Sequence, residues 1–584
     1  MTNTRISSLA SAARFAFAAG AVVSFGSLVS VAAGQTTIRA AMLSGSDAVP
    51  GAAGGTLFLS ASNGGVLLDD AGRVAFAGKT TGTPASGIWS EATSGANGAL
   101  RAIVLQGEAT PGASGGVFGS LENSRLVGSD NGHLAISHQT TLAGSPIGLW
   151  THDGTALSLF ALTGQASPTT PAGTWNLNFI LWPTAMSRGG SLAAVTAFTS
   201  SGTYLGAFAG NAVTPGSVTM CARTELAPAD GYASFSTPQV RSDGSFALPA
   251  SVRVSGTTKS GLFAGACGSF APIVVSGDVI PANVGLPSGS LFLFPTNNGS
   301  SDAPGAIAFI TNISGAGTTI SNDTALWRVD GGVYTLVARE GEQVPGLPSG
   351  TLYGDFKTGG VVGPIASKSG DVAFACFLTG TAVTTQNNRA IMRNVGGTTS
   401  VVLRTGQTPP DYASGTIQSF GSGLALNDAG QLCVGATIAT PPAGRGGSVF
   451  ITAPSGGVPS VLFESGTTRE VRPGAIATIG VPTTDVQTSG GTDGLPRNWS
   501  NGGSLAFRAP YTILASGESG SGVFVVSPPT CRADFNGDGF LDFTDFDDFV
   551  SSFEAGLAIS DFNGDGFLDF TDFDDFVTAF ESGC

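Results

Sequence analysis

The sequence predicts a mainly β protein: a β-propeller of about eight four-stranded blades, followed by a small α-helical module that duplicates a calcium loop. Two observations support this prediction. A glycine-centred motif recurs along most of the 584 residues at intervals of 54 to 73 positions, and such a period indicates repeat architecture. Near the C-terminus, a stretch of seventeen residues occurs twice without a change.

Residues 1–34 have the features of an export signal. Arg5 and Arg14 come before an apolar run over 15–31, and small residues follow it. This order is typical of a secretory signal peptide. The alternative is a membrane-spanning helix, but serines interrupt the run and it is short for a span. We therefore expect an exported chain, extracellular or at the cell surface, with no membrane span in its mature form.

The body, residues 35–526, contains eight copies of the motif. Seven copies have a polar residue, two others, a glycine, two others, an alanine and then an apolar residue, and the copy at Asn427 has Cys433 in place of the alanine. The copies begin at Asp69, Ser129, Ser187, Arg241, Asp302, Ser367, Asn427 and Ser500. Each repeat opens with an apolar strand ending in glycine, and its last strand is often aromatic, as in GLW to Trp150. We expect the four strands of one repeat to form one sheet.

A four-stranded sheet of this size leaves both faces half-exposed, so neighbouring sheets must stack on it. A closed ring of such sheets is a propeller, whereas an open stack is a solenoid with polar end units, which the sequence does not show. The third and fourth repeats match the motif least well, so seven blades are the alternative to eight. The motif glycine is expected to set a turn, and the alanine is expected to let neighbouring blades approach closely.

The duplicated stretch, 534–550 and 561–577, has the oxygen spacing of a twelve-residue calcium loop. Oxygen side chains stand at loop positions 1, 3, 5, 9 and 12, a glycine stands at position 6, and position 7 offers a backbone carbonyl. Clustered carboxylates repel one another unless a cation lies among them, so we expect two bound Ca²⁺ ions. The predicted ligands are Asp534, Asn536, Asp538, Phe540, Asp542 and Asp545 in the first loop, and Asp561, Asn563, Asp565, Phe567, Asp569 and Asp572 in the second.

After each loop, apolar residues follow helical spacing, at i, i+3, i+4 and i+7. Two such helices can bury their phenylalanine faces against each other, and metal binding would add folding energy. Cys531 and Cys584 bracket this module, residues 531–584, so we expect a disulfide between them. Residues 527–530 are the expected linker. The apolar positions are Phe546, Phe549, Val550 and Phe553, then Phe573, Phe576, Val577 and Phe580.

The charge distribution and the histidines argue against several functions. The net charge is −15, of which −13 lies from residue 531 onward, and no basic patch points to nucleic acid. His133, His138 and His152 lie in one repeat, but the first two are an odd number apart and would face opposite sides of a strand. We expect no metal or catalytic role for them. The acidic residues of the body form no recognisable catalytic motif, so we expect a non-catalytic protein.

The C-terminal module resembles a dockerin, the duplicated calcium-loop module by which secreted bacterial proteins attach to cohesin partners. Its ending, Gly583-Cys584, is similar to the GC-type dockerin of planctomycete-like proteins. The resemblance implies a cohesin-like or cell-envelope partner. It places partner-binding residues at loop positions 10 and 11, and identical halves would permit two binding orientations. The phenylalanines at these positions argue against a cellulosomal partner. These residues are Phe543, Thr544, Phe570 and Thr571.

The body is similar to the NxxGxxAF tandem repeat of bacterial "choice-of-anchor" proteins, although only Asn427 carries the asparagine itself. This resemblance implies an exported, anchored protein without an assigned reaction. We therefore expect a propeller that binds an unidentified ligand and is held in place by the calcium module. The alternative is an anchored carbohydrate-active enzyme with its site in the propeller funnel.

The other four cysteines have separate expectations. Cys221 and Cys267 lie within one repeat and are a second candidate disulfide pair. Cys376 and Cys433 stand on strand-like runs, where a cysteine is expected to act as a small buried apolar residue.

Overall fold

The computed structural model describes most of the chain. The residues described are 36–51, 56–58, 65–92, 99–129, 131–169, 172–187, 190–200, 202–214, 216–226, 229–241, 243–300, 306–356, 364–368, 370–484, 486–487, 497–528, 533, 535, 541, 543–563 and 567–582. Within the chain, contacts define two compact units: Ile38–Val526, and a second unit that contains Ser527–Cys584.

In the described residues, the first unit forms eight antiparallel sheets of four or five strands. Sheet 1 has β2 (Leu57–Phe58), β3 (Leu67–Leu68), β4 (Val74–Thr80), β5 (Ser86–Ser90) and β6 (Arg101–Leu105). Sheet 2 has β7 (Arg125–Gly128), β8 (Leu134–Gln139), β9 (Ile147–His152) and β10 (Leu157–Leu162). Sheet 3 has β11 (Ala166–Ser167), β12 (Gly173–Met186), β13 (Ser191–Thr199), β14 (Thr203–Asn211) and β15 (Thr219–Arg223). Sheet 4 has β16 (Gly231–Phe235), β17 (Gln239–Val240), β18 (Phe246–Val254), β19 (Thr257–Ala266) and β20 (Ser269–Val275).

The remaining four sheets follow in chain order. Sheet 5 has β21 (Leu291–Ser300), β22 (Ile307–Ser314), β23 (Thr324–Asp330) and β24 (Val333–Arg339). Sheet 6 has β25 (Thr351–Tyr353), β26 (Ile365–Ala366), β27 (Val372–Gly380), β28 (Arg389–Val395) and β29 (Thr398–Arg404). Sheet 7 has β30 (Thr416–Leu426), β31 (Leu432–Ala439), β32 (Ser448–Ala453) and β33 (Ser460–Glu464). Sheet 8 has β34 (Thr468–Arg472), β35 (Ala475–Ile479), β36 (Leu505–Ile513), β37 (Ser519–Ser527) and the N-terminal β1 (Thr37–Leu43). Short 3₁₀ turns are η1 (Leu121–Asn123), η2 (Ala282–Val284) and η3 (Ala558–Ser560).

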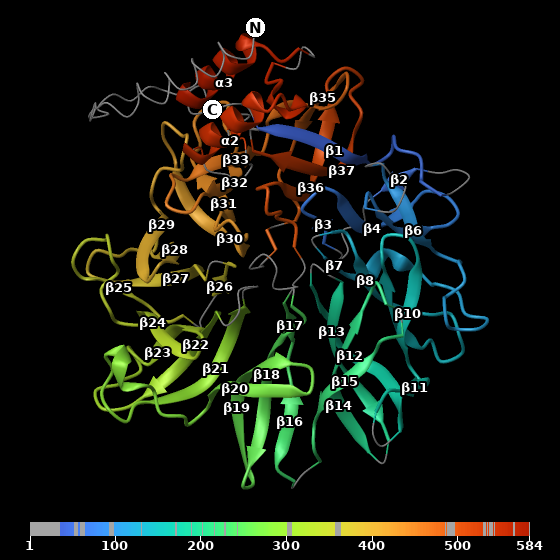
Figure 1. Ribbon diagram of the computed structural model, residues 1–584, viewed down its shortest axis with the longest axis vertical. Coiled ribbons are helices and arrows are strands. Elements are labelled where there is room, and N and C mark those ends of the chain that lie inside the picture. Colours follow the sequence, from blue (N-terminus) through green and yellow to red (C-terminus); the bar gives the residue numbers. More distant parts are fainter. Residues whose placement is uncertain are drawn as a thin grey trace. The chain divides into compact units, whose positions relative to one another are not determined.

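The sheets follow one another around a ring, in chain order (Figure 1). The ring closes between sheets 8 and 1. There, Met42 packs in one cluster with Phe76 and Trp89 of sheet 1 and with Val523 and Val525 of sheet 8. The predicted mainly β propeller is therefore confirmed.

One detail of the prediction was wrong, because a sequence repeat does not form one sheet. The opening strand of each repeat pairs with the sheet before it. Thus β6, the opening strand of the second repeat, pairs with β5 through Gly87↔Leu105. In the same way, β1, the opening strand of the first repeat, pairs with β37 of sheet 8, which precedes sheet 1 in the ring. Each repeat consequently spans two sheets, and the ring is held closed by a strand from the N-terminal end of the unit.

The motif residues have the predicted structural roles. The seven motif glycines in the described residues all have φ between 73° and 87°, a left-handed conformation that glycine adopts without steric cost. Six of the motif alanines lie buried on the strand that follows the motif turn, where a larger side chain would hold the sheets apart. These alanines are Ala75, Ala135, Ala247, Ala308, Ala373 and Ala506.

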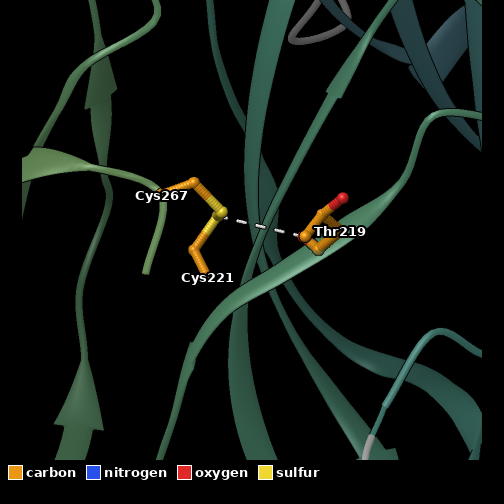
Figure 2. The surroundings of a disulfide bond; sticks show 3 residues. All are labelled: Thr219, Cys221 and Cys267. Carbon is orange, nitrogen blue, oxygen red and sulfur yellow. Dashed lines mark hydrogen bonds between the residues drawn. A yellow bond between two sulfur atoms is a disulfide. The ribbon is translucent and has the colours of Figure 1, made fainter. Parts of the chain in front are cut away.

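One disulfide joins two neighbouring sheets. Cys221 on β15 is bonded to Cys267 in the turn between β19 and β20, with the Cα atoms 4.5 Å apart (Figure 2). The second candidate pair is therefore confirmed. Cys376 and Cys433 are buried in the core, as expected. Cys531 and Cys584 lie outside the described residues.

Among the described residues, the second unit contains two helices, α2 (Phe543–Glu554) and α3 (Phe570–Ser582). Their phenylalanine faces pack together around Phe549 and Phe576, both fully buried. The predicted helical faces are therefore confirmed. In the described part of the chain, no helix is long and apolar enough to cross a membrane.

Candidate functional site

Where the first residue of a described motif is asparagine, aspartate or serine, its side chain supplies a hydrogen-bond acceptor to its own turn. Asn427 Oδ1 accepts the Gln431 N–H at 2.8 Å, and Asp69 Oδ1 accepts the Arg73 N–H at 2.8 Å. Ser187 Oγ accepts the Ser191 N–H at 3.1 Å. Asparagine, aspartate and serine all place an oxygen at the same short reach. This common role explains why the sequence exchanges them at this position.

The turns of three sheets meet in one polar cluster where the ring closes. Asp70 of sheet 1 accepts hydrogen bonds from Arg497 Nη2 at 2.6 Å and from the Asn501 N–H and Nδ2 at 2.9 and 3.0 Å. Asn501 also contacts Asp428 of sheet 7, whose N–H it accepts at 3.0 Å. Asn427 Nδ2 donates to the carbonyls of Ser500 and Asn501 at 3.2 and 3.1 Å.

This polar cluster was missed by sequence reasoning. Asp70, Asp428 and Asn501 each stand second in a motif, and that shared polar position is the signal that was present. A motif read alone does not say that its second residue meets the turn of another repeat. Only ring closure brings Asp70 and Asn501 together across 431 positions.

The last ligand position of each predicted calcium loop lies in the first turn of a helix and is completely buried. Asp545 in α2 and Asp572 in α3 both have 0% exposure. Asp572 Oδ1 accepts the Asn563 N–H at 3.0 Å, and Oδ2 accepts the Asp569 N–H at 2.9 Å. Its carboxylate is therefore turned back towards loop positions 3 and 9.

The surroundings of Asp572 favour its charged form. Burial by itself raises the pKa of this carboxyl, but hydrogen bonds from the backbone N–H groups of Asp569, Asn563 and Phe562 outweigh it. The pKa of Asp572 is therefore lowered from its ordinary value of 3.8. A hydrogen-bonded, ionised carboxylate is the form that binds a cation.

Of the other predicted ligands, the structure describes those at four positions of the second loop. Asp561 is half-buried, and Asn563, Phe567 and Asp569 are exposed. In the described residues, no group of three or more acidic, histidine or cysteine side chains is arranged to hold a metal ion. The remaining predicted ligands, Asp534, Asn536, Asp538, Phe540, Asp542 and Asp565, lie outside the described residues.

The two halves of the module pack as matching copies. Phe549 and Phe576, at the same position of each copy, stack with ring centroids 3.8 Å apart and planes 4° from parallel. Contacts between unlike positions come in matched pairs: Phe546–Phe576 at 6.0 Å and Phe549–Phe573 at 6.2 Å. Reciprocal contacts of this kind define a pseudo-two-fold axis between α2 and α3.

The residues predicted to bind a partner lie on the surface. Phe543 is 58% exposed and Phe570 57% exposed, and Thr544 and Thr571 are exposed beside them. The near-equal exposure of the two phenylalanines agrees with the pseudo-two-fold arrangement.

In the described residues, the three histidines are not part of a group of three or more side chains arranged to hold a metal ion. His133 follows the motif glycine of sheet 2, His138 is on β8, and His152 ends β9. His138 Nδ1 lies 3.0 Å from Ser124 Oγ, and His152 Nδ1 accepts the Gly154 N–H at 3.1 Å.

Together, the ring of sheets and the turns that join its ends define the first unit as a β-propeller. The chain belongs to DUF7453, a family of unknown function, which matches residues 10–363 and again residues 148–529. Two overlapping matches of one family are what a tandem repeat produces, because the same pattern aligns in two registers.

The solved structures compared with this chain resemble it weakly. No curated protein matches the chain. A puromycin hydrolase structure is 12% identical with a TM-score of 0.33, over 82% of this chain and 62% of that one. An oligogalacturonate lyase in complex with manganese is 11% identical with a TM-score of 0.29, over 67% and 96%. The propeller domain of the Trilobed protease from Pyrococcus furiosus is 11% identical with a TM-score of 0.32, over 70% and 98%. The chain thus spans about three fifths of the hydrolase, and likenesses this weak have no bearing on activity.

Proposed function

We propose that this is an exported propeller protein attached to its surroundings through the C-terminal module, which binds two Ca²⁺ ions and a cohesin-type or cell-envelope partner. The observation that carries the proposal is the complete burial of Asp545 and Asp572 at the last ligand position of both loops. A buried carboxylate is costly unless a positive charge or hydrogen bonds compensate it. Two such groups at matching positions fit a pair of cation loops.

The residues present fit calcium by their chemistry. The predicted ligands are carboxylate, amide and backbone oxygens, which are the ligands that this hard cation prefers. Asp572 would supply the closing carboxylate of the second loop, since its oxygens face loop positions 3 and 9. Calcium would supply the positive charge that lets the acidic loops close against the helices.

The exposed phenylalanines support an attachment role. Phe543 and Phe570 place two large aromatic side chains on the surface of a small, highly acidic unit, and aromatic residues are enriched in protein–protein interfaces. Because the two halves match, a partner could engage either one after a half turn. The residues of the partner surface are thus Phe543, Thr544, Phe570 and Thr571.

Two features of the propeller support export and a binding role. The Cys221–Cys267 disulfide is of the kind that persists in oxidising compartments outside the cytosol. The carboxylates at the ring closure are engaged within the protein, since Asp70 is held by Arg497 and Asn501. A propeller that uses such carboxylates for its own closure is better suited to display or ligand binding than to acid–base catalysis.

The test compares the full chain with two double variants. Calcium binding is measured by calorimetry, and partner capture is measured from envelope and secreted fractions of the source organism, with calcium or with a chelator. We expect the unchanged chain to bind two Ca²⁺ ions and to capture a protein only with calcium. Asp545→Asn with Asp572→Asn should abolish both. Phe543→Ala with Phe570→Ala should keep calcium binding and lose capture.

Different outcomes would contradict different parts of the proposal. Absence of calcium binding in the unchanged chain would remove the metal site. Calcium binding with no calcium-dependent capture would leave the loops as structural elements and would refute the attachment role. Tryptophan fluorescence checks that the propeller stays folded in every variant, because every tryptophan of the chain lies before residue 531. Far-ultraviolet circular dichroism of the helices checks the folding of the module.

A further inference from the structure

All three histidines of the protein lie in sheet 2, and each one is placed so that its charged form is disfavoured. His152, 4% exposed, accepts the Gly154 N–H at Nδ1. A proton on that nitrogen would face the amide hydrogen and break the bond. The ring of His152 is therefore held neutral by the hairpin turn that ends β9.

His138 and His133 each have a buried nitrogen without a hydrogen-bond partner in the described part of the chain. These atoms are His138 Nε2 and His133 Nδ1. An imidazolium needs an acceptor at both nitrogens, and a buried N–H without one is costly. His138 Nδ1 already faces Ser124 Oγ, and His133 Nδ1 lies against Gly190 in the motif turn of sheet 3.

The charged groups around these rings compensate only in part. Asp153 favours the charged form of both His133 and His152, but it already accepts hydrogen bonds from Thr155 and Ala156. Asp69 and Arg73 of sheet 1 lie beside Gly132, and their opposite charges pair with each other at 2.7 Å. On the neighbouring strand β7, the positively charged Arg125 stands opposite Ser137, so its side chain lies on the other face of the sheet from His138. Glu122 in η1 is paired with Lys79.

We propose that sheet 2 is an acid-sensitive element of the propeller, which opens when its histidines become protonated and so loosens its contact with sheet 3. Of the described sheets, this is the one in which histidines meet a motif turn of the next sheet, through His133 and Gly190. The other sheets of the ring contain no histidine in the sequence, so their response to acid should be smaller. Mild acid would thus act at one position of the ring.

The size of the effect follows from the titration of the two most buried rings. Burial lowers the pKa of His138 and of His152 from 6.5 to about 4. A folded pKa below the unfolded value means that the stability is fully present above pH 6.5 and is lost as the pH falls towards 4. Between pH 7.5 and pH 5, opening of the sheet should increase about 30-fold for each of these histidines.

The test is hydrogen exchange of the full chain at pH 7.5 and pH 5, corrected for the intrinsic pH dependence of exchange. Peptides from β8 and β9 are compared with peptides from β27 and β28 of sheet 6, which serve as an internal control. We expect protection to fall selectively in sheet 2. The variant His138→Asn with His152→Asn, which keeps a polar atom near each Nδ1 but cannot be protonated, should lose this selective response.

Either of two results would overturn the proposal. One is an equal loss of protection in sheets 2 and 6, and the other is an unchanged acid response in the double variant. A measurement without variants tests the same idea if that variant fails to fold at pH 7.5. NMR titration of the imidazole signals in the unchanged protein should show His138 and His152 titrating well below pH 6.5. Midpoints near 6.5 with sheet 2 intact would overturn it.

Discussion

Asn427 offers the sharpest test of how the ring is held closed, because it joins its own turn to the turn of the next sheet. It is completely buried. Its Oδ1 accepts the Gln431 N–H at 2.8 Å, and its Nδ2 donates to the Ser500 and Asn501 carbonyls at 3.2 and 3.1 Å. Nδ2 also donates to Gln431 Oε1 at 3.0 Å, so its two hydrogens are shared among three acceptors. Asn427→Ala removes all of these bonds at once.

The expected cost can be separated into a turn contribution and an inter-sheet contribution. A hydrogen bond contributes about 1 kcal/mol net, and a buried group left without its partner costs more. Asn427→Ala should therefore reduce the free energy of unfolding by about 3 kcal/mol. Asn427→Ser keeps an acceptor for the turn but loses both inter-sheet donors, so it should cost about 2 kcal/mol.

The matched control is Ser187→Ala, which removes a turn bond of the same kind, to the Ser191 N–H at 3.1 Å. It should cost about 1 kcal/mol. The assay is urea unfolding followed by tryptophan fluorescence, which reports the propeller because residues 531–584 contain no tryptophan. Trp499 adds a local probe, since its Nε1 donates to the Gln431 carbonyl at 3.4 Å. If Asn427→Ser were as stable as the unchanged protein, the inter-sheet bonds would not hold the ring closed and the reasoning would be refuted.

Three further predictions concern the disulfide, the motif glycines and the module. Replacing Cys221 and Cys267 by alanine should reduce the free energy of unfolding by about 4 kcal/mol, because the bond closes a loop of 46 residues; urea unfolding with and without a reductant measures this, and no difference would contradict it. Gly430→Ala should reduce the free energy of unfolding by about 2 kcal/mol, and Gly72→Ala should reduce it by about 1 kcal/mol. Both glycines have a φ of 73°, but an added Cβ would meet Asp371, at 3.2 Å, only at Gly430. Thermal unfolding of both variants tests this ranking. The pKa of Asp572 is lowered below 3.8, so its contribution to the stability of the module should be present above about pH 4 and lost as the pH falls below that. Circular dichroism in the presence of a chelator should show that acid destabilises Asp572→Asn less than it destabilises the unchanged protein. Equal acid sensitivity of the two proteins would contradict this role of Asp572.

Much of the local structure could be predicted because it depends on short-range chemistry. A left-handed turn needs glycine, so the motif glycines marked the hairpins before any contact was known. The apolar spacing after each loop predicted the helices that bury Phe549 and Phe576. Each of these features depends on residues that are close together in the chain, so the sequence is enough to predict it.

Pairing between distant residues could not be predicted in the same way. The opening strand of a repeat has the same apolar pattern whether it pairs within its own repeat or with the preceding sheet, so the offset seen in β6 and β1 was not visible. The polar cluster of Asp70 and Asn501 likewise depends on which turns meet when the ring closes.

The sequence alone determined the propeller class, the turn chemistry of its motif and the oxygen spacing of the two duplicated loops, because each of these repeats a local pattern. The tertiary structure decided how the repeats overlap between sheets, that Cys221 and Cys267 join two sheets, and that the histidines of sheet 2 lie where a proton is disfavoured. The physical reason is that burial and long-range hydrogen bonds exist only after the ring has closed.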